Sequence, residues 1–415
     1  MVVEVSNMDS RFNNEIYSLI EATSESNQCL NCKNPLCVKG CPIHNDIPGF
    51  INQIKENNLE KAREILDRTG GFGDICSYVC YSEDQCMAKC IKGLKGKPVN
   101  IKGLERFICD NTSPNIKPIS KNEKKLCVIG SGPAGLKFSY EALKNGYNVD
   151  IYDKHSELGG LINHAIPSFR LPQSQIKKIE ETLLSMGLKF YSKEINDISK
   201  LPSYDAYFIA TGTDFSYNMN IPGEKLENII DWSELLSSPD NYNFLKNKKV
   251  CVVGGGNVAI DCARTLKRIT SDVSIIYRRT TQEMPCNKKE LEDALKEDVQ
   301  IIELRNPKKI VFDDGLQVTL SIMELSDLDS SGRRSVIATP KEELFKCDYL
   351  IRAIGSKFDN IFNLEMENGK VKVDDNYQTS IPNVYIIGDA YNGATTVVEA
   401  ISHANKVFHL YNQNN

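Results

Sequence analysis

The 415-residue sequence lacks the segments that carry a protein into or through a membrane. Nowhere do about eighteen apolar residues follow one another, which is the length that a membrane-spanning helix needs. Residues 1–6 contain no basic segment followed by an apolar run, so a secretory leader is not indicated. We therefore expect a cytoplasmic protein with no membrane partner.

The sequence also lacks a basic block and a histidine constellation. The formal net charge is −5 and 25% of residues are charged, which argues against nucleic acid as the main partner. Packing or surface roles are expected for all five histidines: His44, His155, His164, His403 and His409. We accordingly predict no catalytic acid, base or nucleophile.

Cysteine, by contrast, is plentiful. Fourteen occur, and eight of them fall between residues 29 and 90. In a chain without an export signal, such a cluster favours metal binding or redox chemistry over disulfides. No closely spaced pair follows residue 135, which argues against the redox-active pair of a pyridine nucleotide-disulfide reductase. The six scattered cysteines are Cys109, Cys127, Cys251, Cys262, Cys286 and Cys347.

The clustered cysteines form two arrays. They read Cys29-x2-Cys32-x4-Cys37-x3-Cys41-Pro42 and Cys76-x3-Cys80-x5-Cys86-x3-Cys90, with two short amphipathic helices predicted between them. Three close cysteines with a distant fourth are typical of a 4Fe-4S cluster. In bacterial ferredoxins the cysteine before proline ligates the other cluster, so the arrays predict two clusters with exchanged ligands. Zinc is the alternative, although only Cys29 and Cys32 form the knuckle that zinc ribbons repeat.

Residues 125–136 combine a short apolar run with a glycine-rich turn. The run predicts a buried parallel strand, and Gly130, Gly132 and Gly135 give the G-x-G-x-x-G turn into a helix. These glycines permit a tight turn, close approach of a pyrophosphate, and close packing of the helix. A second predicted strand ends at Asp153, where a carboxylate can accept hydrogen bonds from a ribose diol. The stretch therefore predicts an FAD site.

Other short segments are expected to complete the FAD site. Glycines and small residues at strand ends let the backbone approach a ligand. An apolar strand running into Gly388-Asp389 places a carboxylate for ribityl hydroxyls, and the following helix N-terminus can stabilise negative charge on the flavin. The additional predicted contacts are Pro133, Ala134, Gly160, Leu161, Arg170, Thr211, Gly212, Gly355, Gly388, Asp389, Thr395, Thr396 and Val397.

A second nucleotide fold begins at residue 248, again as strand, G-x-G-x-x-A turn and helix. Its predicted contacts are Gly254, Gly256, Asn257, Val258, Ala259, Arg278 and Arg279. The strand that follows ends in the two arginines and not in a carboxylate. Because arginine pairs bidentately with phosphate, this favours the 2′-phosphate of NADPH, with NADH as the alternative.

These motifs predict an α/β protein with two Rossmann-like domains, one inserted in the other, preceded by a helical iron–sulfur domain. The expected boundaries are 1–118 for the helical domain, 119–245 and 346–415 for the two parts of the FAD domain, and 246–345 for the NAD(P)H domain. Two prolines in residues 111–120 mark a linker.

At this point the chain resembles a known family along nearly its whole length. It is similar to the small (beta) subunit of NADPH-dependent glutamate synthase, and to the flavin subunit or N-terminal half of dihydropyrimidine dehydrogenase. The resemblance lies in residues 29–42, 103–107, 128–136, 169–172, 252–263, 388–389 and 395–398. Residues 402–406 and Tyr81 depart from the family pattern, which leaves the branch of the family open.

The resemblance implies how the cluster ligands divide. Cys29, Cys32, Cys37 and Cys90 would hold one cluster, and Cys41, Cys80, Cys86 and Glu105 the other. A plain count of eight cysteines for eight iron ligands would choose Cys76 instead of Glu105. We expect Glu105, since an oxygen donor to iron is unusual but possible.

The resemblance also implies an enzyme that receives electrons for a partner. NADPH would pass hydride to FAD, and single electrons would leave through two 4Fe-4S clusters. The three regions use up the chain, so the final acceptor is expected on a catalytic partner subunit. A glutamate synthase large chain is the first expectation and a pyrimidine-reducing subunit the alternative. A non-catalytic zinc and flavin scaffold is the second alternative.

Overall fold

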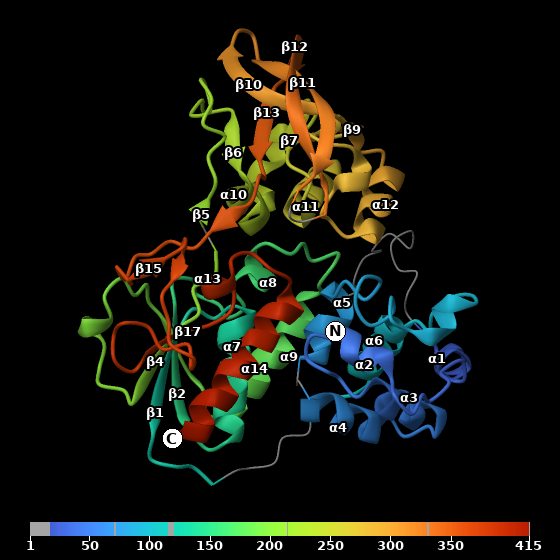
Figure 1. Cartoon of the computed structure of the whole chain (residues 1–415), viewed down its shortest axis with the longest axis vertical. Helices are drawn as coiled ribbons and strands as arrows, with labels where there is room; N and C mark the ends of the chain where they lie inside the picture. Colours follow the sequence, from blue (N-terminus) through green and yellow to red (C-terminus); the bar gives the residue numbers. More distant parts are fainter. Residues whose placement is uncertain (1–16, 70–71, 115–119, 214, 330–331, 415) are drawn as a thin grey trace, which may run out of the picture. The chain divides into compact units, whose positions relative to one another are not determined.

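A computed structural model describes residues 17–69, 72–114, 120–213, 215–329 and 332–414 (Figure 1). The chain forms two compact units: Met1–Asn163 with Ser168–Gly212 and Asn360–Asn415, and His164–Pro167 with Thr213–Asp359. The predicted absence of a leader in residues 1–6, and residues 115–119 of the predicted linker, lie outside the described ranges. Across those ranges no helix has the length and apolar character to traverse a bilayer.

The N-terminal part of the first unit is helical. Its elements are α1 (Leu19–Ser26), α2 (Leu36–Gly40), α3 (Ile47–Lys55), α4 (Leu59–Thr69), α5 (Gly73–Val79), η2 (Ile91–Leu94) and α6 (Ile101–Asn111). Helix α3 begins where the Asp46 side chain accepts from the Gly49 N–H. Phe50 and Ile54 of α3 share a core with Leu104 of α6, and all three side chains are fully buried. The two amphipathic helices predicted between the cysteine arrays are α3 and α4.

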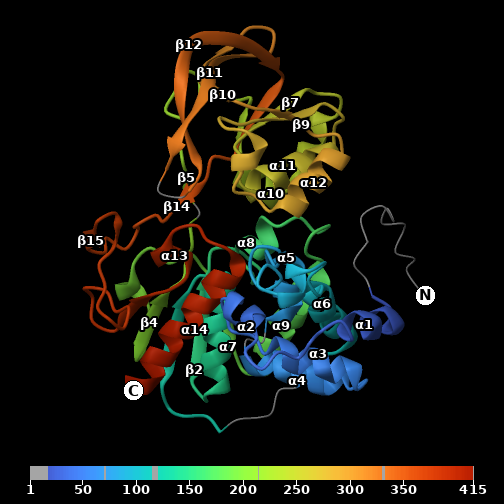
Figure 2. The same ribbon diagram turned by 45° about the vertical axis from the view of Figure 1, so that its right-hand side comes forward.

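The same unit contains a five-stranded parallel sheet in the order β17-β4-β1-β2-β3. The strands are β1 (Lys125–Ile129), β2 (Asn148–Asp153), β3 (Lys189–Ser192), β4 (Ala206–Ile209) and β17 (Val384–Ile386). Helices α7 (Pro133–Lys144) and α14 (Val397–Asn414) lie side by side in both views, with the rings of Phe138 and Phe408 5.6 Å apart (Figures 1 and 2). The end of the chain thus completes a sheet that begins at residue 125.

Smaller elements connect these strands. They are α8 (Leu161–His164), α9 (Gln173–Ser185), η3 (Ile198–Lys200), α13 (Asp389–Asn392), and the pair β15 (Met366–Glu367) and β16 (Lys370–Val371). Helix α9 packs against α5 and is hydrogen-bonded to α6, where Gln175 Nε2 donates to Asp110 Oδ1 at 3.0 Å and Lys178 Nζ donates to the Cys109 carbonyl at 2.8 Å. The helical region expected as a separate domain to residue 118 therefore forms one unit with the sheet.

The second unit has its own parallel sheet in the order β6-β13-β7-β8-β9. Its strands are β6 (Ile229–Asp231), β7 (Val250–Val253), β8 (Val273–Ile276), β9 (Gln300–Ile302) and β13 (Tyr349–Arg352). Its helices are α10 (Trp232–Ser237), η4 (Pro239–Leu245), α11 (Asn257–Lys267), η5 (Thr281–Glu283) and α12 (Lys288–Lys296). Two Rossmann-like sheets, with the second inserted in the chain of the first, confirm the predicted fold class.

An antiparallel sheet belongs to this second unit as well. It consists of β10 (Arg305–Phe312), β11 (Leu316–Leu328) and β12 (Arg334–Cys347), seen side by side in Figure 2. Val318 and Leu320 of β11 share a core with Val253 and Leu350 of the parallel strands. The pair β5 (Phe215–Ser216) and β14 (Ser356–Lys357) completes the unit.

Two predicted boundaries need correction. Strand β6 and helix α10 precede residue 246, and β13 follows residue 346, yet β13 pairs with both β6 and β7. The inserted unit therefore runs from Thr213 to Asp359. Gly355 was predicted to follow a strand of the FAD fold, but that strand is β13 of the second sheet. In the second unit a Cβ at Gly355 would lie 3.6 Å from the Tyr217 ring.

Candidate functional site

The first glycine turn joins β1 to α7 and is tightly packed at two of its three glycines. A Cβ at Gly130, where φ is +104°, would lie 2.4 Å from the Ala210 carbonyl oxygen. A Cβ at Gly135 would lie 2.0 Å from the Gly130 carbonyl oxygen. A Cβ at Gly132 would meet nothing within 4 Å. Two glycines are thus required by the fold, and the third leaves the helix N-terminus accessible to an anionic ligand.

Asp153 ends β2 next to this turn. Its Oδ2 accepts hydrogen bonds from the backbone N–H and the hydroxyl of Ser131, both at 2.7 Å. Its Oδ1 accepts from the His155 N–H at 2.9 Å. Burial alone would raise the pKa of Asp153, but these hydrogen bonds from His155 and Ser131 hold it below the usual value. The turn therefore carries an ionised carboxylate, as a ribose-binding residue requires.

The C-terminal segment reaches the same turn from β17. Gly388 has φ of +65°, and a Cβ there would lie 2.4 Å from the Ala134 Cβ at the start of α7. The carboxylate of Asp389 accepts from the Thr395 N–H at 3.2 Å, and burial raises its pKa. Thr396 precedes α14, and its hydroxyl donates to Glu399 Oε2 at 2.7 Å. The predicted Gly-Asp strand end and last helix are thus brought to the glycine turn.

His403 is a neighbour of this segment whose contact sequence reasoning missed. Its Nδ1 accepts a hydrogen bond from the Gly388 N–H at 2.9 Å, and the residue is 8% exposed. The ring stacks on Tyr391 with an interplanar angle of 7°. Burial, and then the charge of Lys406, lowers the pKa of His403 from 6.5 to about 4. In the sequence, the only signal for this contact is that residues 402–406 depart from the family pattern.

The remaining predicted FAD residues lie in three loops of the first sheet. A Cβ at Gly160, where φ is +52°, would lie 2.8 Å from the Gly132 Cα, so the loop before Leu161 covers the turn. Thr211 and Gly212 follow β4 directly after Ala210, and Gly212 has open space around its Cα. Arg170 lies between α8 and α9 and is partly buried.

The second glycine turn joins β7 to α11 with the same geometry. A Cβ at Gly254, where φ is +142°, would lie 2.1 Å from the Ala353 carbonyl oxygen. A Cβ at Gly255 would lie 2.3 Å from the Tyr277 ring, whereas one at Gly256 would meet nothing within 4 Å. At the start of α11, Asn257 Oδ1 accepts from the Asn287 N–H at 2.8 Å. Val258 and Ala259 continue its first turn.

The two arginines after β8 differ in their surroundings. Arg278 is exposed. Arg279 is 6% exposed, and its Nη2 lies 2.7 Å from Asp329 Oδ2, beyond the end of β11. The sequence presented them as equivalent, but only Arg278 extends into solvent.

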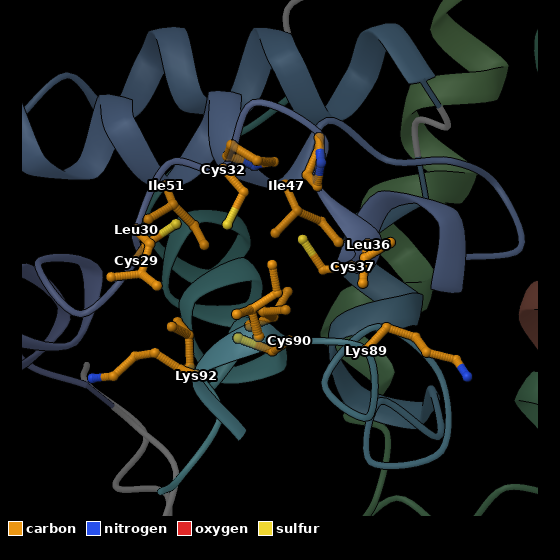
Figure 3. Close-up of a pocket in the computed structure, with 15 residues that line it drawn as sticks. Cys29, Leu30, Cys32, Leu36, Cys37, Ile47, Ile51, Lys89, Cys90 and Lys92 are labelled. Carbon is orange, nitrogen blue, oxygen red and sulfur yellow. The ribbon is translucent and has the colours of Figure 1, made fainter. Parts of the chain in front are cut away.

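Four cysteines from the two arrays line one pocket, and we call them the first cysteine site: Cys29, Cys32, Cys37 and Cys90. Figure 3 shows their sulfurs directed into the same space from α2, its preceding loop and the start of η2. Burial raises the pKa of Cys37 to about 11, and the neighbouring Cys90 and Cys29 add to the rise. Thiols crowded in this way ionise readily only when a metal centre supplies positive charge.

A second cysteine site contains Cys41, Cys80, Cys86 and Glu105, with Cys76 beside them. Burial raises the pKa of Cys41 to about 12, with smaller contributions from Glu105 and Cys80. Burial also raises the pKa of Cys86, to which Cys41, Glu105 and Cys80 add. Cys76 and Cys80 share a side-chain hydrogen bond. The structure thus brings together both of the ligand sets left open by the sequence.

Glu105 lies in α6 between this site and a buried ion pair. Asn45 Nδ2 donates to Glu105 Oε1 at 3.4 Å. Burial raises the pKa of Glu105 to about 8, and the charge of Asp74 adds to the rise. Asp74 is itself paired with Arg63, whose Nη2 lies 2.6 Å from Asp74 Oδ2. A nearby positive charge from a metal centre would favour the ionised form of Glu105.

The first cysteine site has the form that a cluster requires. In the described ranges, no three Cys, His, Asp or Glu side chains converge closely enough to hold a single metal ion. Thiolates that bind a 4Fe-4S cluster each ligate a different iron, so they surround a volume and do not converge on one point. The four sulfurs of the first site surround such a volume (Figure 3).

Comparison with known proteins places these sites in a family. Residues 124–404 match the model described as pyridine nucleotide-disulphide oxidoreductase, and residues 6–116 match dihydropyrimidine dehydrogenase domain II, 4Fe-4S cluster. The NADPH glutamate synthase small chain of Halomonas elongata is 28% identical over 93% of this chain and 89% of its own. The NADP(+)-dependent formate dehydrogenase subunit beta of Moorella thermoacetica is 33% identical over 89% of this chain and 58% of its own.

Among solved structures, Mycobacterium tuberculosis FprA in complex with NADPH aligns with a TM-score of 0.60 and 18% identity, covering 70% of this chain and 85% of FprA. At this identity the likeness shows the fold alone. The chain belongs to the pyridine nucleotide-disulphide oxidoreductase family, as a glutamate synthase small chain-like NAD(P)H-dependent flavin oxidoreductase with a 4Fe-4S domain of dihydropyrimidine dehydrogenase type.

Proposed function

We propose that the chain oxidises NADPH and delivers single electrons, through two 4Fe-4S clusters, to a partner subunit of glutamate synthase type. The observation that carries this proposal is that the FAD turn and both cysteine sites lie in one compact unit. Bound FAD supplies the hydride acceptor, and bound clusters supply the one-electron carriers. The chain supplies binding, orientation and electrostatics.

The FAD-binding part of the proposal rests on residues around the first turn. Gly132 leaves the start of α7 open to the pyrophosphate, and Asp153 accepts hydrogen bonds from the ribose. Asp389 and the N-terminus of α14 face the ribityl and ring portions. The full proposed set is Gly130, Gly132, Pro133, Ala134, Gly135, Asp153, Gly160, Leu161, Arg170, Thr211, Gly212, Gly388, Asp389, Thr395, Thr396 and Val397.

The NADPH-binding part rests on the second turn. Gly254, Gly256 and the first turn of α11 through Asn257, Val258 and Ala259 hold the pyrophosphate. Arg278 pairs with the 2′-phosphate, because it is the exposed one of the two arginines. Arg279 follows Arg278 in the chain, and its ion pair with Asp329 would hold this end of the strand in place.

The cluster-binding part assigns one cluster to each cysteine site. Cys29, Cys32, Cys37 and Cys90 hold the first. Cys41, Cys80, Cys86 and Glu105 hold the second, as the family resemblance implies, and Glu105 acts electrostatically on all three of these thiols. Cys76, which is hydrogen-bonded to Cys80, takes a packing role.

Replacing the two competing residues tests the ligand set. We expect Glu105→Ala to lose or alter the second cluster, seen as a changed electron paramagnetic resonance spectrum of the reduced protein and about four fewer irons. Cys76→Ser should keep the iron count and the spectrum. The reverse pattern would assign Cys76 as the ligand.

The partner is proposed from the relatives. Similarity to glutamate synthase small chains covers nearly all of both chains, which favours a large chain of that enzyme. The 4Fe-4S match to dihydropyrimidine dehydrogenase keeps a pyrimidine-reducing partner as the alternative. The formate dehydrogenase relative carries additional sequence, since this chain spans 58% of it.

An anaerobic co-purification tests the whole proposal. We expect a large partner chain to copurify, with one flavin and about eight irons and eight acid-labile sulfides per chain. NADPH should bleach the flavin and reduce the clusters in the same sample. A pyrimidine-reducing partner would change the acceptor and keep the mechanism, whereas zinc without acid-labile sulfide would contradict the electron-transfer function.

A further inference from the structure

The two cysteine sites differ in their distance from the FAD fold. Beside Cys41, the Pro42 carbonyl accepts from the Ser402 hydroxyl of α14 at 2.8 Å. Helix α5, which carries Cys76, packs against α9 and α14. The second site thus adjoins the FAD sheet. The first site is bordered by its own loops and by α3, and its pocket opens among exposed side chains.

These exposed side chains are apolar. Leu30, Leu36 and Ile91 line the pocket of the first site and are 62%, 43% and 39% exposed. Leu94 is 82% exposed. Residues three apart in a 3₁₀ helix lie over one another, so Ile91 and Leu94 of η2 form one apolar stripe. Exposed apolar side chains gathered in this way are typical of an interaction site.

The two chain segments that supply the first site carry charges of one sign. Residues 27–45 and 85–104, which supply the first site, contain seven lysines and no aspartate or glutamate. The rest of the chain is acidic enough to bring the formal net charge to −5. Figure 3 shows Lys89 and Lys92 extending outward on either side of the sulfurs. Lys95 and Lys97 are exposed just beyond them.

We propose that this surface, formed by Leu30, Leu36, Ile91 and Leu94 within the lysine rim, docks a protein electron acceptor with an acidic surface around its redox centre. The inference rests on the proposed function and extends it by naming the exit point and the charge of the partner. An apolar centre with a charged rim is the usual anatomy of a protein interface. Opposite charges on the partner steer the encounter and fix its orientation.

Charge also decides between possible occupants. A second copy of the chain docked through the same surface would bring two lysine rims together, which like-charge repulsion opposes. The lysines could instead only compensate the negative charge of a cluster bound in the first cysteine site. These two roles predict different kinetics, because a partner-docking role depends on the charge of the acceptor and a cluster-stabilising role does not.

The experiment uses one acceptor in two charge states. Native cytochrome c is basic, and exhaustive succinylation of its lysines makes the same haem protein acidic. With NADPH as donor, each turnover releases NADP⁺ and one proton and reduces two ferric haems to ferrous. The holoprotein should reduce the succinylated form about tenfold faster than the native form at low salt, and the difference should vanish at high salt.

Charge reversal then locates the surface. Lys95→Glu with Lys97→Glu should remove or invert the preference for the acidic form. A matched control, Lys121→Glu with Lys189→Glu, makes the same charge change at exposed lysines on the FAD sheet and should keep it. Leu94→Asp should slow both acceptors. Ferricyanide reduction by NADPH, which needs no protein docking, should be unchanged in all variants.

Four outcomes would overturn the proposal. The first is an equal loss in the control pair, and the second is a preference that does not depend on salt. The third is a parallel loss of both acceptors in the Lys95 and Lys97 variant with a shifted cluster potential, which would assign the lysines to the cluster. Dimerisation abolished by Leu94→Asp would assign the surface to a second copy. Loss of ferricyanide reduction in the unmodified protein would instead refute the proposed function.

Discussion

The two glycine turns of this chain are built alike, but the strands that follow them end in different side chains. In each, the first glycine packs against a carbonyl oxygen of the neighbouring parallel strand: Gly130 against Ala210, and Gly254 against Ala353. In each, the third residue of the turn has open space around its Cα. The strands that follow end differently, in Asp153 on one side and in Arg278 and Arg279 on the other.

This comparison separates what forms a nucleotide site from what selects the nucleotide. The turn depends on backbone geometry, and the fold that contains it recurs in FprA at 18% identity. The end of the second strand carries the chemical choice, because a carboxylate accepts from a ribose diol and a guanidinium pairs with a phosphate. Each substitution below changes one of the two nucleotide sites and should leave the other unchanged.

The largest effect is expected from the packed glycines. Gly130→Ala places a methyl group 2.4 Å from a carbonyl oxygen at φ of +104°, and should destabilise the first unit by at least about 2 kcal/mol. Purified protein should contain little flavin. Gly254→Ala should retain flavin and lose NADPH oxidation. Flavin absorbance and thermal unfolding of both variants measure this.

The open glycines provide the control for that experiment. Gly132→Ala and Gly256→Ala meet no atom within 4 Å, so both should fold with wild-type thermal stability. Their methyl groups instead face the bound pyrophosphate, and each should weaken only its own nucleotide. Unfolding of Gly132→Ala to the same extent as Gly130→Ala would show that the turn is constrained on both sides.

The carboxylate at the end of β2 should have the next largest effect. Asp153→Ala removes the acceptor for the Ser131 and His155 hydrogen bonds and for the ribose diol. We expect FAD affinity to fall by about ten- to a hundredfold, which corresponds to losing one or two hydrogen bonds to a charged group. NADPH binding to the second unit, measured by calorimetry on the flavin-free protein, should not change.

The two arginines should have unequal effects on nucleotide choice. Arg278→Ala should lower kcat/KM for NADPH by about tenfold to a hundredfold and leave that for NADH nearly unchanged. Arg279→Ala removes a buried partner of Asp329 and should lower both values together, through loss of structure. A selective NADPH defect in Arg279→Ala alone would show that the ion pair opens to receive the phosphate.

Much of this arrangement follows from sequence because local patterns determine it. Both turns, the apolar strands before them and the helices after them were predicted from glycine spacing and apolar runs. The grouping of Cys90 with the first array was not available from spacing, since η2 and its preceding loop bring it there from a distance of more than fifty residues. The resemblance to a family supplied that grouping.

The differences between the sequence and the structure have a common physical cause. An apolar strand looks the same whichever sheet it enters, so β13 and Gly355 were placed in the FAD fold although β13 pairs with β6 and β7. Likewise, Arg278 and Arg279 have the same chemistry in sequence. Only folding brings Asp329, fifty residues away, against Arg279 and not Arg278.

The smallest effect at neutral pH is expected from replacing His403. Its contribution depends on pH and concerns the stability of the first unit alone. The Gly388 N–H donates to its Nδ1, so the folded state needs the neutral ring. Because the pKa of His403 is lowered from 6.5 to about 4, the unfolded chain binds the proton more readily over that range. Stability contributed by this residue is therefore present above pH 6.5 and is lost as pH falls toward 4.

Flavin release between pH 7 and 5 should report this loss. His403→Asn should remove part of the pH dependence and lower stability modestly at pH 7, because the amide oxygen can still accept a hydrogen bond but the stacking on Tyr391 is lost. His409, on the same helix, lies at an exposed position, so His409→Asn should leave the pH profile unchanged. If both variants released flavin with the wild-type pH dependence, the acid sensitivity would arise from other residues. The hydrogen bond from Gly388 to His403 would then contribute equally at every pH.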